Sequence, residues 1–429
     1  MWAGIVYTIA PYHLNQLYRS SVLAEYAACS ILPFAFAFVD RVCRKGRTSD
    51  VAGLSAAYAL LILVHLPLTV IGSLSLLVYG ALRIKREMFW QTLMRLALAV
   101  LLALAASSFF WTTVLAELSW IKGSSIDPNI NFDYRMNFLF SPWALTNFST
   151  WYANLLGLAT IGLLLPAIVL VKRAFFAKQR DTALRAIFLL ALVSFLMATD
   201  LSRPVWAIVP KLRDVQFPWR WLGITAMCSS ILLAASIPEW VEKVKTSFRP
   251  RDLVIVSGLA LSLLFVATQI IWNAEYLQGQ AFVSKFPIAA RGSVSFKDWL
   301  PIWAKEVIQM KKMTNDVEAG SREVKISSWE PEHRIFQIGS GPATEARVRT
   351  YYYPHWTAKS QGKSLVIRPS DDGALLITVP AEETNVELEF REPRRVGIAR
   401  FVSGCGWMLI AVLFVFAPAR QFLLRLSKI

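Results

Sequence analysis

The chain is poor in charged residues, which make up 17% of its 429 residues. Soluble globular proteins carry about a quarter. Hydrophobic residues make up 55%, and they collect in long apolar runs. A run of about 20 apolar residues is long enough to cross a bilayer as a helix. The composition therefore excludes an ordinary soluble protein and predicts an integral membrane protein.

Cysteine and histidine are also scarce, with four residues of each. Cys29, Cys43, Cys228 and Cys405 lie in or beside apolar runs and lack the spacing of a disulfide framework or a zinc site. The histidines are scattered, which argues against a histidine metal site. No cofactor is identified from the residues, no metal ligands are assigned, and a divalent metal ion stays an open alternative.

The formal net charge is +16. In a soluble protein this excess would indicate nucleic acid. In a membrane protein, Lys and Arg collect on cytoplasmic loops and set the orientation of the spans. We therefore expect membrane lipid as a partner and no nucleic acid. The oligomeric state stays open.

Eight apolar runs follow one another along the chain. The second run is interrupted at His65-Leu66-Pro67, so we expect a hairpin that crosses twice, which gives about nine spans. A single kinked helix there would give eight. The runs lie at residues 20–39, 51–82, 96–116, 151–171, 186–199, 219–237, 253–272 and 401–417. Basic segments follow alternate spans, so the amino terminus is expected outside the cell and the carboxyl terminus in the cytoplasm.

Residues 273–399 lack an apolar run and show strand patterns instead. Val386, Leu388 and Phe390 alternate with glutamates, as in a half-buried strand. The segment 370–373, Ser-Asp-Asp-Gly, separates two apolar stretches and predicts a hairpin turn. A helix is expected at 297–313. We predict an α-helical bundle at 1–272, an extracytoplasmic β sandwich of six or seven strands at 273–399, and a final helix with a basic tail at 400–429.

Three segments resemble one family of bacterial membrane proteins. The first, residues 7–26, contains Pro-Tyr, Tyr-x-Arg and Glu in series. The second, 197–221, contains the fairly specific string Gln-Phe-Pro-Trp-Arg at 216–220. The third, 352–381, is similar to a Tyr-Pro-Gly-Trp β module, with His355 where the family commonly has Gly. The family is the pyruvoyl-tetrahydropterin-synthase-related one, which looks like a relative of the YfhO-type proteins and of the GT-C glycosyltransferases.

The resemblance implies a protein of the bacterial cytoplasmic membrane that handles a polyprenyl-phosphate-linked sugar at the outer face. GT-C proteins usually carry their catalytic acidic residue in the first outer loop, and no segment here matches it. We therefore expect the amino-terminal catalytic part of the family to be absent from this chain, and its activity stays open. Two alternatives are a non-enzymatic scaffold or accessory protein in envelope polysaccharide assembly, and a transporter.

Four basic residues near the outer ends of the spans depart from the usual charge asymmetry. They are Arg203, Lys211, Arg213 and Arg220. Arginine binds phosphate in a bidentate manner, so the four are candidates for the lipid-phosphate site. Anchoring of helix ends at lipid headgroups is an equally weighted alternative.

Glu25 lies inside the first apolar run, where an unpaired carboxylate is costly and where ionisable residues are functional candidates. Arg19 is near enough in sequence to pair with it. A structural ion pair between them is favoured over a direct contact with substrate.

Outer-side carboxylates are candidates for the general base of a glycosyl transfer. They are Asp127, Asp133, Asp200 and Asp214. No spacing selects one of them, and loop aspartates usually bind nearby backbone donors. The sequence therefore predicts no catalytic residue.

Overall fold

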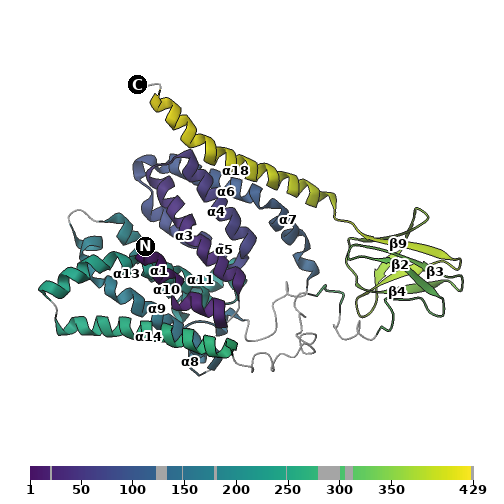
Figure 1. The fold of residues 1–429 in the computed structure, drawn as a ribbon, viewed down its shortest axis with the longest axis horizontal. Helices are drawn as coiled ribbons and strands as arrows, with labels where there is room; N and C mark the ends of the chain where they lie inside the picture. Colours follow the sequence, from purple (N-terminus) through teal and green to yellow (C-terminus); the bar gives the residue numbers. More distant parts are fainter. Residues whose placement is uncertain are drawn as a thin grey trace. The chain divides into compact units, whose positions relative to one another are not determined.

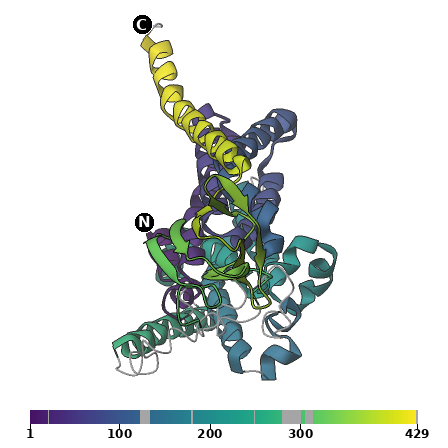
Figure 2. The ribbon, with the colours of Figure 1, turned by 90° about the vertical axis from the view of Figure 1, so that its right-hand side faces the viewer.

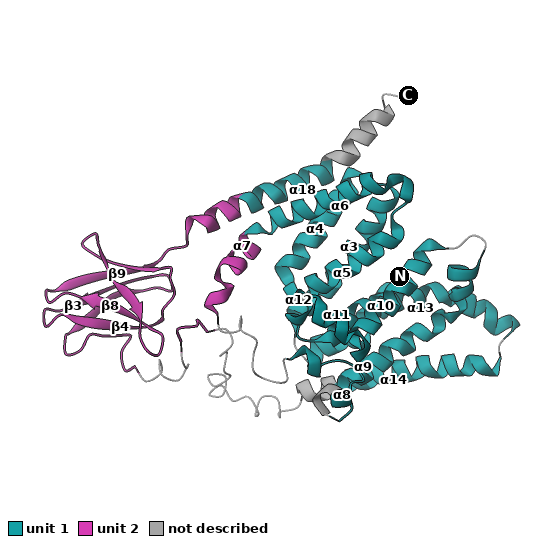
Figure 3. Cartoon of the chain, turned by 180° about the vertical axis from the view of Figure 1, so that it is seen from behind, with its two compact units in different colours: residues 1–108, 128–285, 402–429 teal, residues 109–127, 286–401 magenta. Residues whose placement is uncertain are grey.

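The computed structural model describes residues 1–19, 22–121, 133–146, 148–177, 181–247, 249–278, 300–304 and 313–426. The chain forms two compact units (Figure 3). The first comprises residues 1–108, 128–285 and 402–429, and the second comprises residues 109–127 and 286–401.

The first unit consists of helices. In chain order these are α1 (Trp2–Thr8), α2 (Pro11–Leu14), α3 (Leu23–Arg44), α4 (Thr48–Val64), α5 (Leu66–Arg83), α6 (Phe89–Ala106), α8 (Pro142–Thr146), α9 (Phe148–Leu164), α10 (Thr182–Ala198), α11 (Arg203–Ile208), α12 (Pro210–Arg213), α13 (Leu222–Thr246) and α14 (Pro250–Gln278) (Figure 1). Its core is built largely of Ala, Leu, Val and Ile side chains, as expected for helices packed in an apolar bundle.

Seven helical segments among the described residues are long and apolar enough to cross a membrane. They are Leu23–Arg44, Leu66–Arg83, Arg86–Ala106, Tyr152–Leu170, Pro218–Thr246, Pro250–Gln269 and Arg394–Val415. The shorter apolar helices α4 and α10 have 17 residues each. Together these segments account for every apolar run of the sequence, with two helices in the second run. The number of crossings stays a prediction.

The interrupted run folds as the expected hairpin of α4 and α5. His65 is extended, with φ −158° and ψ 99°, and its Nδ1 accepts a hydrogen bond from the backbone N–H of Leu68 at 3.1 Å. Pro67 lies in the first turn of α5, where a missing N–H costs nothing. Tyr58 and Ser73 join the two helices by a hydrogen bond of 2.6 Å between their hydroxyls.

Basic side chains hold the opposite end of this hairpin. The Arg83 guanidinium, at the end of α5, contacts Asp40 of α3 at 2.8 Å and the hydroxyl of Thr182 at 2.6 Å. The end of α5 therefore lies beside the start of α10. In the same way, Lys243 of α13 pairs with Asp252 of α14 at 2.6 Å.

The second unit contains an antiparallel β sandwich of two sheets before the last helix, as predicted (Figure 1 and Figure 2). The strands are β1 (Val317–Glu318), β2 (Val324–Trp329), β3 (His333–Ile338), β4 (Thr344–Tyr351), β5 (Trp356–Ser360), β6 (Lys363–Leu365), β7 (Ile367–Pro369), β8 (Ala374–Val379) and β9 (Thr384–Phe390). In the described residues one sheet has the order β1-β4-β8-β7 and the other β2-β3-β9-β5-β6. Strands β1 and β5 were not predicted.

The expected alternation of apolar and polar residues and the expected turn are both present in the sandwich. In β9, Val386 and Leu388 are fully buried and the exposed Glu387 lies between them, because successive side chains of a strand point to opposite faces. The segment 370–373 joins β7 to β8, with Gly373 at φ +89°. The helix expected at 297–313 is wrong in its described part: residues 300–304 form a turn and an isolated bridge between Pro301 and Ile121.

Two helices complete the second unit. Helix α7 (Ser108–Glu117) follows α6 after a single residue. Helix α18 (Arg394–Leu426) begins just after β9, and its residues from Val402 onward belong to the first unit.

Candidate functional site

Glu25 is the centre of a buried polar cluster in the first unit. It lies in the first turn of α3 and is 0% exposed. One carboxylate oxygen accepts hydrogen bonds from the hydroxyl of Tyr12 and from Nε2 of Gln16, the latter at 3.0 Å. The other accepts from Nε of Arg220 at 3.1 Å, and Nε2 of His65 lies 3.8 Å from it. The carboxylate is therefore desolvated but compensated by three donors.

The Gln-Phe-Pro-Trp-Arg string places Arg220 in this cluster. Gln216 has φ +66°, a backbone conformation that is uncommon for residues other than glycine. The turn continues into a 3-10 helix, Pro218–Trp221. A second guanidinium nitrogen of Arg220 donates to the carbonyl of Val215 at 2.6 Å, and the Phe217 ring lies 4.9 Å from the guanidinium carbon.

Glu25 is thus paired with an arginine other than the one predicted. Arg220 was predicted as a phosphate ligand, and its side chain is 10% exposed and paired with Glu25. The side chain of Arg19 lies outside the described residues, so its pairing with Glu25 stays a prediction. The contact between Glu25 and Arg220 spans 195 positions, and no local pattern could have predicted it.

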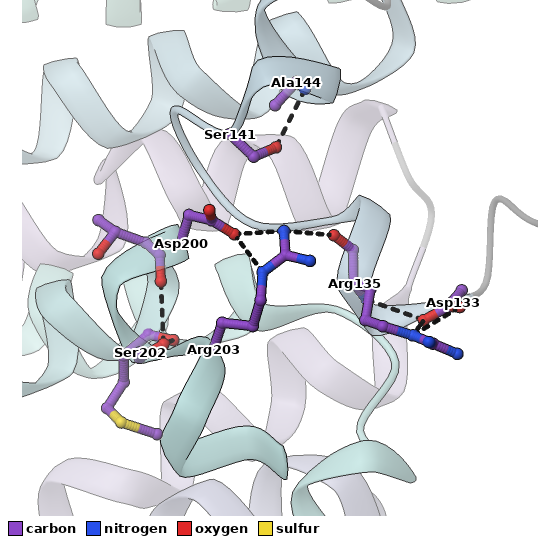
Figure 4. A network of polar contacts seen from close by, with 9 residues as sticks. Asp133, Arg135, Ser141, Ala144, Asp200, Ser202 and Arg203 are labelled. Atoms are coloured by element: carbon purple, nitrogen blue, oxygen red, sulfur yellow. Dashed lines mark hydrogen bonds and ion pairs between the residues drawn. The ribbon is translucent and has the colours of Figure 1, made fainter.

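Arg203 holds a second, exposed network (Figure 4). Its guanidinium contacts a carboxylate oxygen of Asp200 at 2.5 and 2.9 Å and the backbone carbonyl of Arg135 at 3.4 Å. Arg135 in turn pairs with Asp133 at 3.1 Å. The side chains of Arg203 and Arg135 are 44% and 62% exposed, so both cations are open to solvent.

The next two predicted cations follow in α12. The ammonium of Lys211 lies 3.0 Å from Asp214, in a pair that is well exposed on both sides. Arg213 donates to the carbonyl of Ala207, near the end of α11. Three of the four predicted cations, Arg203, Lys211 and Arg213, therefore lie on the segment 200–214, which we call the cationic loop. Asp200 and Asp214 each pair with a cation of this loop, Asp133 pairs with Arg135 outside it, and Asp127 lies outside the described residues.

A third cluster, in the second unit, was missed by the sequence reasoning. Glu117 ends α7 and accepts hydrogen bonds from Tyr353 at 2.7 Å, His355 at 2.9 Å and Arg395 at 2.6 Å. The ring of Trp120 packs edge-on against the rings of Tyr353 and His355, each at 5.4 Å. The sequence signal that could have identified this cluster is the carboxylate of Glu117 directly after the apolar run 96–116.

The surroundings of Glu117 decide its charge. Burial alone would raise its pKa, but hydrogen bonds from His355, Tyr353 and Arg395 outweigh burial and hold the pKa below its ordinary value. Burial, with a further effect of the adjacent Glu117 charge, raises the pKa of Tyr353. The cluster is therefore an ionised carboxylate held by neutral and cationic donors.

Within the described ranges, no three His, Cys, Asp or Glu side chains are grouped so that they could hold a metal ion. The chemistry that the described clusters offer is thus cation and carboxylate chemistry: an exposed loop of cations paired with aspartates, a buried ion pair, and a separate glutamate cluster.

Comparison with known protein families identifies a match to the amino-terminal part of the chain. The family described as 6-pyruvoyl-tetrahydropterin synthase related domain, a membrane-protein family, matches residues 1–277. That region includes the Glu25 cluster and the cationic loop. Neither a curated protein nor a solved structure matches the chain. Since the match covers well over half of the chain, the protein belongs to the 6-pyruvoyl-tetrahydropterin synthase related family of membrane proteins.

Proposed function

We propose that this membrane protein binds a polyprenyl-phosphate-linked sugar and that the cationic loop receives the phosphate. The observation that carries the proposal is the exposure of its cations. Arg203 and Lys211 are 44% and 80% exposed, and both are paired with aspartates that are themselves solvent-accessible. Such exposed pairs contribute little, about 0–1 kcal/mol, so a phosphate can take over the cations at small cost.

The stereochemistry of the loop suits a phosphate group. The Arg203 guanidinium is already oriented by Asp200 and by the Arg135 carbonyl, which reduces the side-chain freedom lost on binding. A guanidinium presents two parallel N–H donors to a phosphate, whereas Lys211 adds a compact charge. Both kinds of contact favour an anionic headgroup over a neutral sugar.

In this proposal Arg220 is a positioning residue. Its guanidinium joins the carbonyl of Val215, at the end of the cationic loop, to Glu25 on α3. It therefore fixes where the loop leaves the bundle, and the exposed cations bind the ligand.

The orientation and the reaction are part of the same proposal. The positive-inside rule places the cationic loop on the outer side, where a polyprenyl-linked donor presents its sugar. The GT-C resemblance implies inverting glycosyl transfer, in which a carboxylate takes the proton of the acceptor hydroxyl. Asp200 and Asp214 lie beside the loop cations and Asp133 lies beside Arg135, and we assign the role of base to none of them.

Binding of a polyprenyl-phosphate sugar to the full chain in lipid nanodiscs tests the proposal. We expect Arg203→Ala and Lys211→Ala to weaken binding, with Arg203→Ala losing about tenfold, the scale of one charge-assisted hydrogen bond. Lys245→Ala is the matched control, since Lys245 is an exposed lysine in the last turn of α13, far in sequence from the loop. Absence of binding by folded wild-type protein would overturn the proposal in favour of an accessory role.

A further inference from the structure

The second unit contains a groove beside the glutamate cluster. It has a volume of about 600 Å³ and runs between α7, the end of β9 and the first turns of α18. Its walls are mostly apolar and include Phe109, Phe110, Val114, Phe390 and Val396, with Arg400 at the same groove. Glu117, His355 and Tyr353 line it as well and are fixed by their mutual hydrogen bonds.

The two helical walls continue into apolar spans. Helix α7 follows the candidate span Arg86–Ala106 after one residue, and α18 carries the candidate span Arg394–Val415 from its first turn. Large apolar side chains outside the groove are exposed on the same two helices, with Leu115 at 73% and Phe401 at 74%. Such surfaces are stable in contact with lipid chains rather than with water.

Arg400 gives the groove a cationic side. Its guanidinium lies 2.6 Å from the carboxylate of Glu392, and both side chains are exposed, at 61% and 44%. A pair this exposed is weak and exchangeable. Arg394 and Arg395 precede it on the same helix, and Arg394 is exposed. Two carboxylates, Glu117 and Glu392, also line the groove and are paired with Arg395 and Arg400. The three arginines at the start of α18 therefore leave one cation in excess beside the apolar walls, which favours an anion over a zwitterion.

We propose that this groove binds an anionic membrane lipid, with one apolar chain against Phe109, Phe110, Val114, Phe390 and Val396 and the phosphate at Arg400. A lipid bound there contacts the loop that carries Tyr353 and His355. It is independent of the proposed function, since the groove belongs to the second unit and the cationic loop to the first.

Photolabelling of the full chain in nanodiscs tests the inference. The probe is phosphatidylglycerol with a photoreactive acyl chain, and the comparison is phosphatidylcholine with the same chain. We expect the anionic probe to label peptides from α7 and the start of α18 about fivefold more strongly, the effect of one basic residue beside an anionic headgroup.

Two pairs of variants separate the groove from general lipid contact. Thr113→Trp places a large ring among the lining residues and should abolish labelling, whereas Leu115→Trp, on the exposed side of the same helix, should not. Arg400→Gln should remove the preference for the anionic probe, whereas Arg391→Gln should keep it, because Arg391 sits in a similar exposed pair outside the groove. Equal labelling by both probes, or unchanged labelling in folded Thr113→Trp, would overturn the inference.

Discussion

Arg220 donates a hydrogen bond from Nε to a carboxylate oxygen of Glu25 at 3.1 Å, and both side chains are buried. Removing one member of a buried pair leaves the other uncompensated, at a cost of about 3–5 kcal/mol. We expect Arg220→Met to lower the thermal stability of the detergent-solubilised protein strongly. The double variant with Glu25→Gln should recover part of the loss. A double-mutant cycle on melting temperature measures this coupling, and simple additivity would contradict it.

Two turn glycines separate the two costs of a glycine substitution, the backbone conformation and the steric clash: Gly373 lies between β7 and β8, and Gly362 between β5 and β6. Gly373 has φ +89°, and an added Cβ would lie 2.4 Å from the Cα of Ala304. Gly362 has φ +80° with no atom within 4 Å of that position. Gly362→Ala should cost about 1 kcal/mol through the backbone conformation alone. Gly373→Ala should cost clearly more. Unfolding monitored by tryptophan fluorescence compares the stabilities of the two variants. Equal losses of stability would show that the close contact with Ala304 adds no cost.

The ionised Glu117 makes the second unit sensitive to acid. Hydrogen bonds hold the folded pKa of Glu117 below its ordinary value of about 4.3, which describes the unfolded chain. The carboxylate therefore stabilises the fold fully above that value, and its contribution is lost as the pH falls through the lowered folded pKa. Melting curves of wild type and Glu117→Gln should differ at neutral pH and converge in acid. A difference that does not shrink as the pH falls below the ordinary carboxyl pKa would contradict the assignment.

Arg322 closes the end of the sandwich. Its guanidinium donates to the carbonyls of Gly339, Pro380 and Glu382 at 2.6–2.7 Å and to that of Pro342 at 3.3 Å. Arg322→Ala would leave these acceptors without the charged donor, and we expect a loss of about 3 kcal/mol or more. Arg322→Lys should recover only part of it, because an ammonium cannot reproduce the planar fork. Full recovery of thermal stability in Arg322→Lys, measured by a thermal-shift assay, would contradict this role of the guanidinium.

Local patterns predicted much of the fold. The alternation around Val386 identified β9, and the break at Pro67 identified the α4–α5 hairpin, because each signal is contained in a few consecutive residues. Strand β5 was missed because Trp356–Ser360 contains one buried residue, Ala358, among half-buried ones. Its apolar periodicity is therefore weak, and its place in the sheet comes from pairing with β9.

The candidate site was less predictable for a different reason. Glu25, Arg203, Lys211 and Arg213 were found because a charge inside or beside an apolar run is unusual in itself. The contacts of Glu25 with Tyr12, Gln16 and Arg220 could not be predicted, because they form only through tertiary packing. Glu117 and His355 are separated by 238 positions, so their contact is encoded in the whole fold.

The extended residue His65 bears on how the chain enters a bilayer. It is all that separates α4 from α5, and its ring caps the second helix instead of facing water as a loop would. The connection between the two helices contains no polar segment that could remain on one side of the membrane during synthesis. We therefore expect the two helices to enter the bilayer together as one hairpin, which the hydroxyl contact between Tyr58 and Ser73 holds closed.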